Sequence, residues 1–254
     1  MTSWLDGQFV GDGTLPRRTG VAPFETMGAV RGGVPLWDLH LTRLAAAAKR
    51  LALSWAPAPG WRAAAAELLR GNGHDDGVLR LSLLPGTGGV HVAMVTRQRA
   101  PLSAVRLLPT VVGRPATAPP ADLKSEPRGF YDAVRQQAQD GGADDGIVVA
   151  ADGAVLETAL GNLWLRLDGG WVTPPAAGRI LPGIARGLVL AQAAKAGRPV
   201  AERACDLGDL QRASALAHSN AVYGVRPACL LGQGPAVQIV DSELGPLWRA
   251  ATSG

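Results

Sequence analysis

The chain of 254 residues is poor in several features on which whole protein classes depend. Its only cysteines are Cys205 and Cys229, which excludes a multi-disulfide scaffold and an all-cysteine zinc site. No apolar run reaches the ~20 residues that span a bilayer, and the start, MTSWLDGQFV, lacks the pattern of a signal peptide. The 25 basic residues are dispersed among 21 acidic ones, so no nucleic-acid face is indicated. We expect a cytoplasmic globular protein with no nucleic-acid, membrane or metal partner.

Lysine is scarce among the 25 basic residues. Only Lys49, Lys124 and Lys195 occur, and the others are arginines. Arginine stays protonated, whereas lysine can lose its proton and act as an amine nucleophile. Lys49 and Lys195 fall near the ends of alanine-rich helical patterns, where a solvated cation suits the helix C-terminus. Lys124 follows a proline-rich segment at a predicted domain junction, so it is either an exposed loop lysine or a functional amine.

Hydrophobic residues make up 47% of the chain, enough for a real core. The pattern predicts two α/β (α+β) domains with a cleft between them: residues 1–112, a linker at 113–122, and residues 123–254. Strand pairs with glycine-containing turns are predicted for residues 4–10, 24–37, 145–157 and 162–173. Helical spacing predicts helices within residues 38–53, 61–73, 130–140, 184–197 and 206–219, the last running into a strand. Asp38 is the expected N-cap of the first helix, and Gly71 and Gly197 are expected to close the second and fourth.

Several segments carry a more specific pattern. Glu157 is followed five residues later by Asn162, then by Val172-Thr173-Pro174-Pro175 and by Leu181-Pro182-Gly183-Ile184-Ala185-Arg186. This series resembles the signature of the class IV aminotransferase family, the fold-type-IV pyridoxal phosphate enzymes. The resemblance extends over nearly the whole chain through Phe24-Glu25-Thr26, His40-Leu41-Thr42-Arg43-Leu44 and the late segment from Ser219 to Pro227. In the family, the cofactor lysine precedes the glutamate by about the 33 positions that separate Lys124 from Glu157 here.

The resemblance implies a role for each of these residues toward pyridoxal phosphate. Lys124 would hold the cofactor as a Schiff base and shuttle protons, and Glu157 would keep the pyridine nitrogen protonated. The phosphate would bind Arg43 and the helix start at Ile184 and Ala185. Asn162, Ser219, Asn220 and Ala221 would complete the cofactor site, and Arg128, Tyr223 and Arg226 are candidates for the substrate carboxylate. Each residue also has a plain structural alternative, such as a solvent-facing arginine or a partnered surface acid.

Within the family, two features favour 4-amino-4-deoxychorismate lyase, which releases pyruvate and 4-aminobenzoate for folate synthesis. Arg128 follows the lysine by four positions, and Asn220-Ala221 stands where aminotransferases tend to have hydroxyl residues. The alternatives are an aminotransferase acting on branched-chain or D-amino acids with 2-oxoglutarate, and a relative without turnover. The resemblance also implies a homodimer. Dinucleotide binding through Gly11-Asp12-Gly13 is disfavoured, because the glycines lack the G-x-G-x-x-G spacing and no helix follows.

Overall fold

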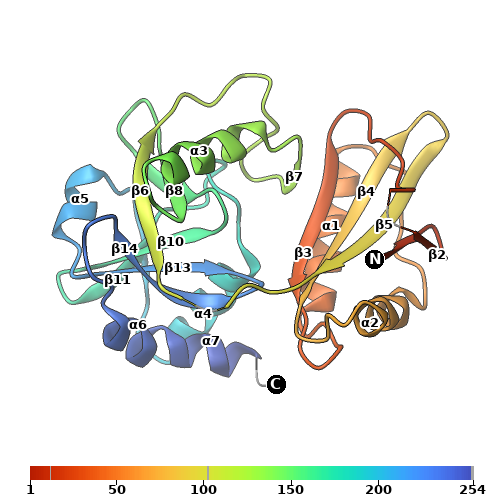
Figure 1. Cartoon of the computed structure of the whole chain (residues 1–254). Helices are drawn as coiled ribbons and strands as arrows, with labels where there is room; N and C mark the ends of the chain where they lie inside the picture. Colours follow the sequence, from red (N-terminus) through yellow and green to blue (C-terminus); the bar gives the residue numbers. More distant parts are fainter. Residues whose placement is uncertain (12, 102, 253–254) are drawn as a thin grey trace. The chain divides into compact units, whose positions relative to one another are not determined.

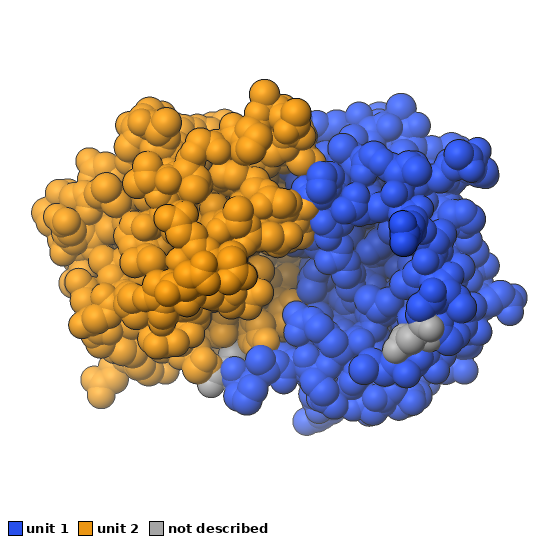
Figure 2. All heavy atoms as spheres, turned by 45° about the horizontal axis from the view of Figure 1, so that its top comes forward, with its two compact units in different colours: residues 1–101, 123–127 blue, residues 102–122, 128–254 orange. Residues whose placement is uncertain are grey.

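The computed structural model describes residues 1–11, 13–101 and 103–252, so Asp12 of the glycine pair lies outside the described residues. The chain forms two compact units, which Figure 2 shows in different colours. Unit 1 comprises Met1–Pro101 and Leu123–Pro127, and unit 2 comprises Leu102–Asp122 and Arg128–Gly254. Within the described chain, no helix is long and apolar enough to cross a membrane.

Unit 1 contains a six-stranded antiparallel sheet in the order β2-β1-β5-β4-β3-β7 (Figure 1). Its strands are β1 (Thr2–Leu5), β2 (Gln8–Gly11), β3 (Ala22–Gly28), β4 (Val78–Gly86), β5 (Gly89–Arg97) and β7 (Ser125–Glu126). Strand β7 is short and comes later in the sequence than the other five strands of this sheet. It pairs Ser125 with Pro23 and Glu126 with Ala22, which fixes Lys124 beside the β3 edge of the sheet.

The two faces of the unit 1 sheet differ because side chains alternate along each strand. One face carries Met27, Leu79, Leu81, Leu83 and Met94, which are fully buried against helices α1 (Trp37–Arg50) and α2 (Trp61–Gly71). The opposite face carries partly exposed polar residues between the apolar ones. These include Arg80 and Ser82 of β4, which stand opposite Thr26 and Phe24 of β3. We call this second side the helix-free face.

Unit 2 is built on an eight-stranded mixed sheet in the order β12-β11-β10-β13-β14-β6-β8-β9 (Figure 1). Strand β6 pairs in parallel with both β14 and β8, and the pairs from β9 to β8 and from β14 to β11 are antiparallel. The strands are β6 (Val105–Val111), β8 (Asp145–Val149), β9 (Val155–Thr158), β10 (Asn162–Leu167), β11 (Gly170–Thr173), β12 (Ala201–Glu202), β13 (Ala215–Asn220) and β14 (Gly224–Leu230).

The helices of unit 2 cover its sheet with three apolar clusters. Trp164 and Trp171 pack with Val189 of α4 and with residues of the C-terminal helices, and Val134 of α3 packs with Val148. The helices are α3 (Gly129–Asp140), α4 (Ile184–Lys195), α5 (Leu207–Arg212), α6 (Val237–Glu243) and α7 (Gly245–Thr252). This packing fixes the ends of β9, β10 and β13, where Glu157, Asn162, Ser219 and Asn220 lie.

The structure confirms the two-sheet α/β fold, and most of the predicted turns lie where the glycines indicate. Asp6, Gly153 and Gly169 all adopt positive φ between paired strands. The second predicted strand pair is wrong, because β3 continues only to an isolated bridge between Val30 and Gly33. The predicted cap at Asp38 is also wrong. That residue lies in the first turn of α1, and the N-cap is Leu36.

Two further details differ from the prediction. Gly71 is the last residue of α2 rather than its stop, and the left-handed residue that follows is Gly73, with φ of 68°. The predicted boundary at residue 112 shifts as well. Strand β6 lies before the proline-rich segment, yet its partners on both sides belong to unit 2. Leu123–Pro127 joins unit 1, because β7 pairs with β3, so Lys124 belongs to unit 1.

Candidate active site

Glu157 on β9 is buried in unit 2 and accepts hydrogen bonds from three neutral groups. The phenol of Tyr131 donates to Oε1 at 2.6 Å, the backbone N–H of Leu181 reaches both carboxylate oxygens at 3.2 Å, and Nδ2 of Asn162 lies 3.3 Å from Oε2. A carboxylate offers about four lone-pair positions. These hydrogen bonds fix the orientation of both carboxylate oxygens.

Tyr131 belongs to α3 and enters the site from the helix side. Burial raises the pKa of its phenol well above the ordinary value, and the charge of Glu157 and the hydrogen bond to it act in the same direction. The phenol is therefore a donor at every ordinary pH. Tyr131 is not among the site residues that the sequence predicts, although it is one of only two tyrosines and falls in a predicted helix that begins soon after Lys124.

Asn162 connects Glu157 to the start of α4. Its Nδ2 also donates to the carbonyl of Leu181 at 2.9 Å, and a Cβ at Gly183 would lie 2.0 Å from its Oδ1, so only glycine fits there. Gly183 is the N-cap of α4, and within the described chain no side chain caps this helix. The first N–H groups of α4, at Ile184 and Ala185, therefore point out of the helix as donors for an anion.

The turn between β13 and β14 lies next to these residues, because Asn162 pairs with Ser219 across the sheet. The Ser219 hydroxyl accepts a hydrogen bond from Nε1 of Trp164 at 2.8 Å, and both groups are buried. Asn220 donates to the carbonyl of Leu160 and accepts from the backbone N–H groups of Val222 and Tyr223. Ala221 follows within this turn. The structure thus gathers Glu157, Asn162, Ile184, Ala185 and Ser219–Ala221 at one end of the unit 2 sheet.

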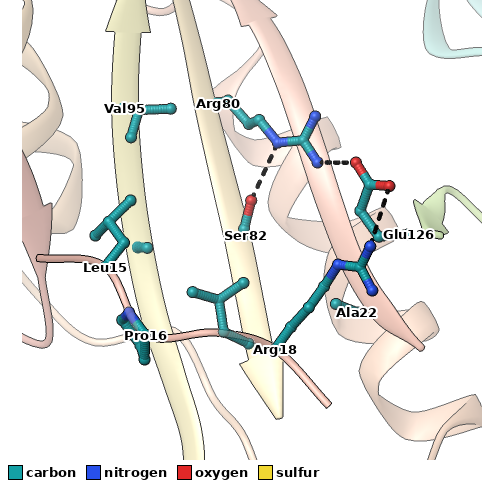
Figure 3. Close-up of a pocket in the computed structure, with 10 residues that line it drawn as sticks. Leu15, Pro16, Arg18, Ala22, Arg80, Ser82, Val95 and Glu126 are labelled. Carbon is teal, nitrogen blue, oxygen red and sulfur yellow. Dashed lines mark hydrogen bonds and ion pairs between the residues drawn. The ribbon is translucent and has the colours of Figure 1, made fainter. Parts of the chain in front are cut away.

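Lys124 belongs to unit 1 and lies on its helix-free face. Its carbonyl accepts the backbone N–H of Phe24 at 3.1 Å, and its Nζ lies 4.7 Å from the centroid of the Phe24 ring. Cζ of Arg80 lies 3.7 Å from the same centroid. The Phe24 ring is thus contacted by both the Lys124 amine and the Arg80 guanidinium. Arg80 also lines an open pocket of unit 1 together with Arg18 and Glu126 (Figure 3).

Arg43 on α1 forms a forked ion pair with Glu25 of β3. Its Nε donates to Oε1 at 2.8 Å and its Nη2 to Oε2 at 2.6 Å, while Nδ1 of His40 lies 2.7 Å from Oε2. Burial acts to raise the pKa of Glu25, but the hydrogen bonds and charges of Arg43 and His40 outweigh it and lower the pKa to about 2. Burial lowers the pKa of His40. Glu25 therefore holds the Arg43 guanidinium in a fixed orientation through Nε and Nη2.

The three candidates for a substrate carboxylate all lie in unit 2. Nη2 of Arg128 donates to the carbonyl of Ala159 at 2.8 Å, and Nε of the same side chain lies 3.6 Å from Asp132. Arg226 stacks its guanidinium 4.2 Å from the centroid of the Tyr223 ring, and burial lowers its pKa. Each candidate thus has a local contact, and none of these contacts involves Glu157.

The architecture of the chain is that of a known class of protein. Solved fold-type-IV enzymes share this architecture. The family model for class IV amino-transferases matches residues 22–231. The chain therefore belongs to the class IV aminotransferase family, whose cofactor is pyridoxal phosphate. A search of curated proteins gives no sequence match.

Several solved structures are similar over almost their full length. A Legionella pneumophila protein assigned as a 4-amino-4-deoxychorismate lyase is 22% identical, with 94% of this chain and 97% of that chain covered and a TM-score of 0.81. A branched-chain aminotransferase from Thermoproteus uzoniensis is 23% identical, with 100% and 95% covered and a TM-score of 0.83. A protein from Mycobacterium tuberculosis described as a hypothetical aminotransferase, in its pyridoxal-phosphate-bound form, is 22% identical, with 99% of each chain covered and a TM-score of 0.82.

The residues present fit pyridoxal phosphate on the chemistry of their donors. Glu157 supplies a buried carboxylate oriented by neutral donors, the α4 start supplies uncapped N–H groups, and Arg43 supplies a guanidinium held by Glu25. Lys124 supplies the only lysine amine of the chain outside the helices α1 and α4. One departure is Ala185, which offers its backbone but no hydroxyl.

Proposed function

We propose that this protein is a pyridoxal-phosphate-dependent lyase that converts 4-amino-4-deoxychorismate into pyruvate and 4-aminobenzoate. The observation that carries this choice is the turn after β13. Its side-chain amide, Asn220, makes three hydrogen bonds inside unit 2, and the neighbouring Ser219 hydroxyl accepts from Trp164. An aminotransferase must bind an amino donor and then a keto acid, whereas a lyase binds a single substrate. Because Ser219 and Asn220 already form hydrogen bonds within unit 2, this turn is better suited to an enzyme that binds one substrate than to one that binds two in succession.

In this proposal, Lys124 and Glu157 are the catalytic residues. Bound pyridoxal phosphate supplies an electron sink for the carbon that loses a proton. Lys124 would hold the cofactor through its amine, and the same amine would take the proton from the substrate carbon that bears the amino group. Glu157 would face the ring nitrogen, and the hydrogen bonds from Tyr131, Leu181 and Asn162 fix its two oxygens.

The remaining residues bind and orient. Arg43 and the N–H groups of Ile184 and Ala185 receive the phosphate, with Ser219, Asn220 and Ala221 beside them. Asn162 shapes the site by joining Glu157 to the segment before α4. For a substrate carboxylate, Arg128, Tyr223 and Arg226 stay as candidates. We further propose a cytoplasmic homodimer, which light scattering of the purified protein tests.

The net reaction balances without a second substrate. One ring carbon–hydrogen bond and the bond from the ring to the enolpyruvyl oxygen break, the ring becomes aromatic as 4-aminobenzoate, and the leaving group takes up a proton as pyruvate. Aromatisation makes the reaction strongly downhill. The enzyme therefore needs neither an oxidant nor a 2-oxo acid.

A competition of substrates tests this proposal. Purified enzyme is incubated separately with 4-amino-4-deoxychorismate alone, with leucine plus 2-oxoglutarate, and with D-alanine plus 2-oxoglutarate. We expect turnover only in the first reaction. Steady glutamate formation in either of the others would identify an aminotransferase, and no turnover in any of them would identify a non-catalytic relative.

A further inference from the structure

Arg186 is a buried arginine in the first turn of helix α4 that the proposed mechanism does not use. The helix begins at Ile184 after the N-cap Gly183, so Arg186 is its third residue. In an α-helix the Cα–Cβ bonds tilt toward the N-terminus, and a Cβ at Gly183 would lie 3.6 Å from Cβ of Arg186. The arginine side chain therefore starts beside the N–H groups that are proposed to receive the phosphate.

The Arg186 guanidinium connects the start of α4 to the ends of two strands. Its Nη2 donates to the carbonyl of Pro174, just after β11, at 2.9 Å and to Oε2 of Glu202, in β12, at 2.5 Å. These strands pair in parallel, with Glu202 opposite Thr173. Nε of Arg186 is also buried, and it has no hydrogen-bond partner among the described residues. The fold thus orients the guanidinium through Nη2 and buries a second N–H group without an acceptor from the described chain.

The first turn of a helix is an unfavourable place for a cation unless an anion is close. The helix macrodipole places about half a positive charge at the N-terminus. The first turn of α4 contains no acidic residue, and no side chain of the described chain caps it. Glu202 offsets the charge of Arg186 only in part, because the Glu202 side chain is 45% exposed to screening water while that of Arg186 is 5% exposed. An anion at the helix start would stabilise both the helix dipole and the buried arginine.

We infer that Arg186 is a positioning residue for the cofactor phosphate, which strengthens the binding of a dianion at the start of α4 through its buried charge. It acts together with the N–H groups of Ile184 and Ala185 and needs no contact of its own with the phosphate, because charges in a low dielectric interact over a longer range than exposed ones. Ala185 offers no hydroxyl, so the first turn supplies only backbone donors and this charge. The inference rests on the proposed function in one respect, the placement of the phosphate at α4.

A purely structural role for Arg186 predicts a different result at Glu202. If the arginine only joins α4 to β12, Glu202→Gln should weaken the binding of every ligand, because it removes one attachment of the helix. If the charge of Arg186 acts on the phosphate, the same change removes the competing anion and should tighten the binding of phosphate ligands. The two roles therefore differ in the sign of the effect.

The inference is tested by ligand binding to the full chain freed of cofactor, without turnover. The probes are pyridoxal phosphate and pyridoxal, followed by absorbance, and inorganic phosphate, measured by its competition with pyridoxal phosphate. We expect Arg186→Gln to bind pyridoxal phosphate and inorganic phosphate about tenfold more weakly, with an unchanged affinity for pyridoxal, which carries no phosphate. Arg186→Lys keeps the charge and should keep most of the affinity. Glu202→Gln should bind both phosphate ligands more tightly and pyridoxal equally.

Arg166→Gln is the matched control, because Arg166 forms a forked ion pair with Glu243 elsewhere in unit 2. It should lower the stability in urea denaturation and leave the affinity for all three ligands unchanged. If Arg186→Gln does not fold, Glu202→Gln decides, because it leaves the arginine in place. Unchanged phosphate affinity in Arg186→Gln, an equal loss for pyridoxal phosphate and pyridoxal, or weaker phosphate binding in Glu202→Gln would overturn the inference.

The inference and the proposed function fail separately in this design. If the variants change phosphate affinity as expected but the protein releases no pyruvate from 4-amino-4-deoxychorismate, the role of Arg186 stands and the proposed lyase activity falls. If the lyase reaction proceeds while Arg186→Gln binds pyridoxal phosphate as the unmodified protein does, only the role of Arg186 falls.

Discussion

The phenol of Tyr131 donates a hydrogen bond of 2.6 Å to Oε1 of Glu157, and this bond joins helix α3 to strand β9. Tyr131 follows Lys124 by seven residues, so the segment that carries the proposed cofactor lysine continues into the helix that orients Glu157. Because of this hydrogen bond, the position of α3 helps to set the orientation of the Glu157 carboxylate. The same bond makes Tyr131 a positioning residue rather than a catalytic one.

Replacing this phenol should therefore slow turnover without removing the site. In Tyr131→Phe we expect kcat to fall about tenfold with little change in KM, and the free energy of unfolding to fall by about 1–3 kcal/mol, because a buried bond to a charged group is lost. Steady-state kinetics and urea denaturation measure the two effects. The matched control is Tyr223→Phe, the only other tyrosine, which should alter KM more than kcat. An unchanged kcat in Tyr131→Phe would remove it from the site.

The role of Lys124 is open to a direct chemical test. Borohydride reduction of the protein with pyridoxal phosphate should place the cofactor on the peptide that contains Lys124, as detected by mass spectrometry. Lys124→Ala should give no adduct and no activity while retaining the unfolding midpoint of the unmodified protein. Lys49→Arg and Lys195→Arg are the controls and should behave as the unmodified protein. An adduct on either of those residues would contradict the assignment.

The charge of Glu157 should matter more than its shape. Glu157→Gln preserves the volume, but a neutral amide cannot stabilise a protonated ring nitrogen. We expect bound cofactor to be retained, as measured by absorbance after gel filtration, and kcat to fall by about 10²–10⁴-fold. Glu67→Gln, on the exposed side of α2, is the control. Turnover at the unmodified rate in Glu157→Gln would exclude this carboxylate from the mechanism.

Glu25 should contribute stability that depends on pH. Its pKa is lowered from 4.5 to about 2, so the folded protein binds fewer protons than the unfolded chain between these values. The contribution is therefore fully present above pH 4.5 and is lost as the pH falls through about 2. We expect Glu25→Gln to be less stable than the unmodified protein by about 3 kcal/mol at pH 7.

Urea denaturation across the acid range measures this contribution. The stability difference between Glu25→Gln and the unmodified protein should shrink steadily as the pH falls below 4.5. Glu67→Gln, measured in parallel, should show no difference that closes with pH. A difference that stays constant down to pH 2 would mean that Glu25 is not held as an anion by Arg43 and His40.

The sequence predicts local structure well where short-range chemistry decides it. The turns at Asp6-Gly7, Asp152-Gly153 and Asp168-Gly169 are hairpin turns whose strands alternate in the usual way, and Gly197 does end α4 with a positive φ. Of Glu25 and the two residues of unit 1 that contact its carboxylate, His40 and Arg43, the resemblance predicts a functional role only for Arg43. Its partner Glu25 lies 18 positions earlier and becomes visible only when β3 packs on α1.

The features that sequence reasoning missed depend on long-range pairing. Nothing in the residues around Lys124 indicates that β7 will join β3 about a hundred positions earlier, yet this pairing decides to which unit the lysine belongs. The pocket of Arg18, Arg80 and Glu126 likewise combines three separate segments. Helices α6 and α7 were not predicted either. They pack through a few apolar residues such as Val240 and Leu244, in a segment interrupted by Gly and Pro.

The central claim, a lyase that uses one substrate, is tested most directly by product stoichiometry over many turnovers. The protein is saturated with pyridoxal phosphate, dialysed free of 2-oxo acids and supplied with 4-amino-4-deoxychorismate. Pyruvate and 4-aminobenzoate are then measured in the same samples. The account predicts equal amounts of both at every time, at a rate that added 2-oxoglutarate does not change. A reaction that stops after one turnover and resumes only when 2-oxoglutarate is added would contradict it.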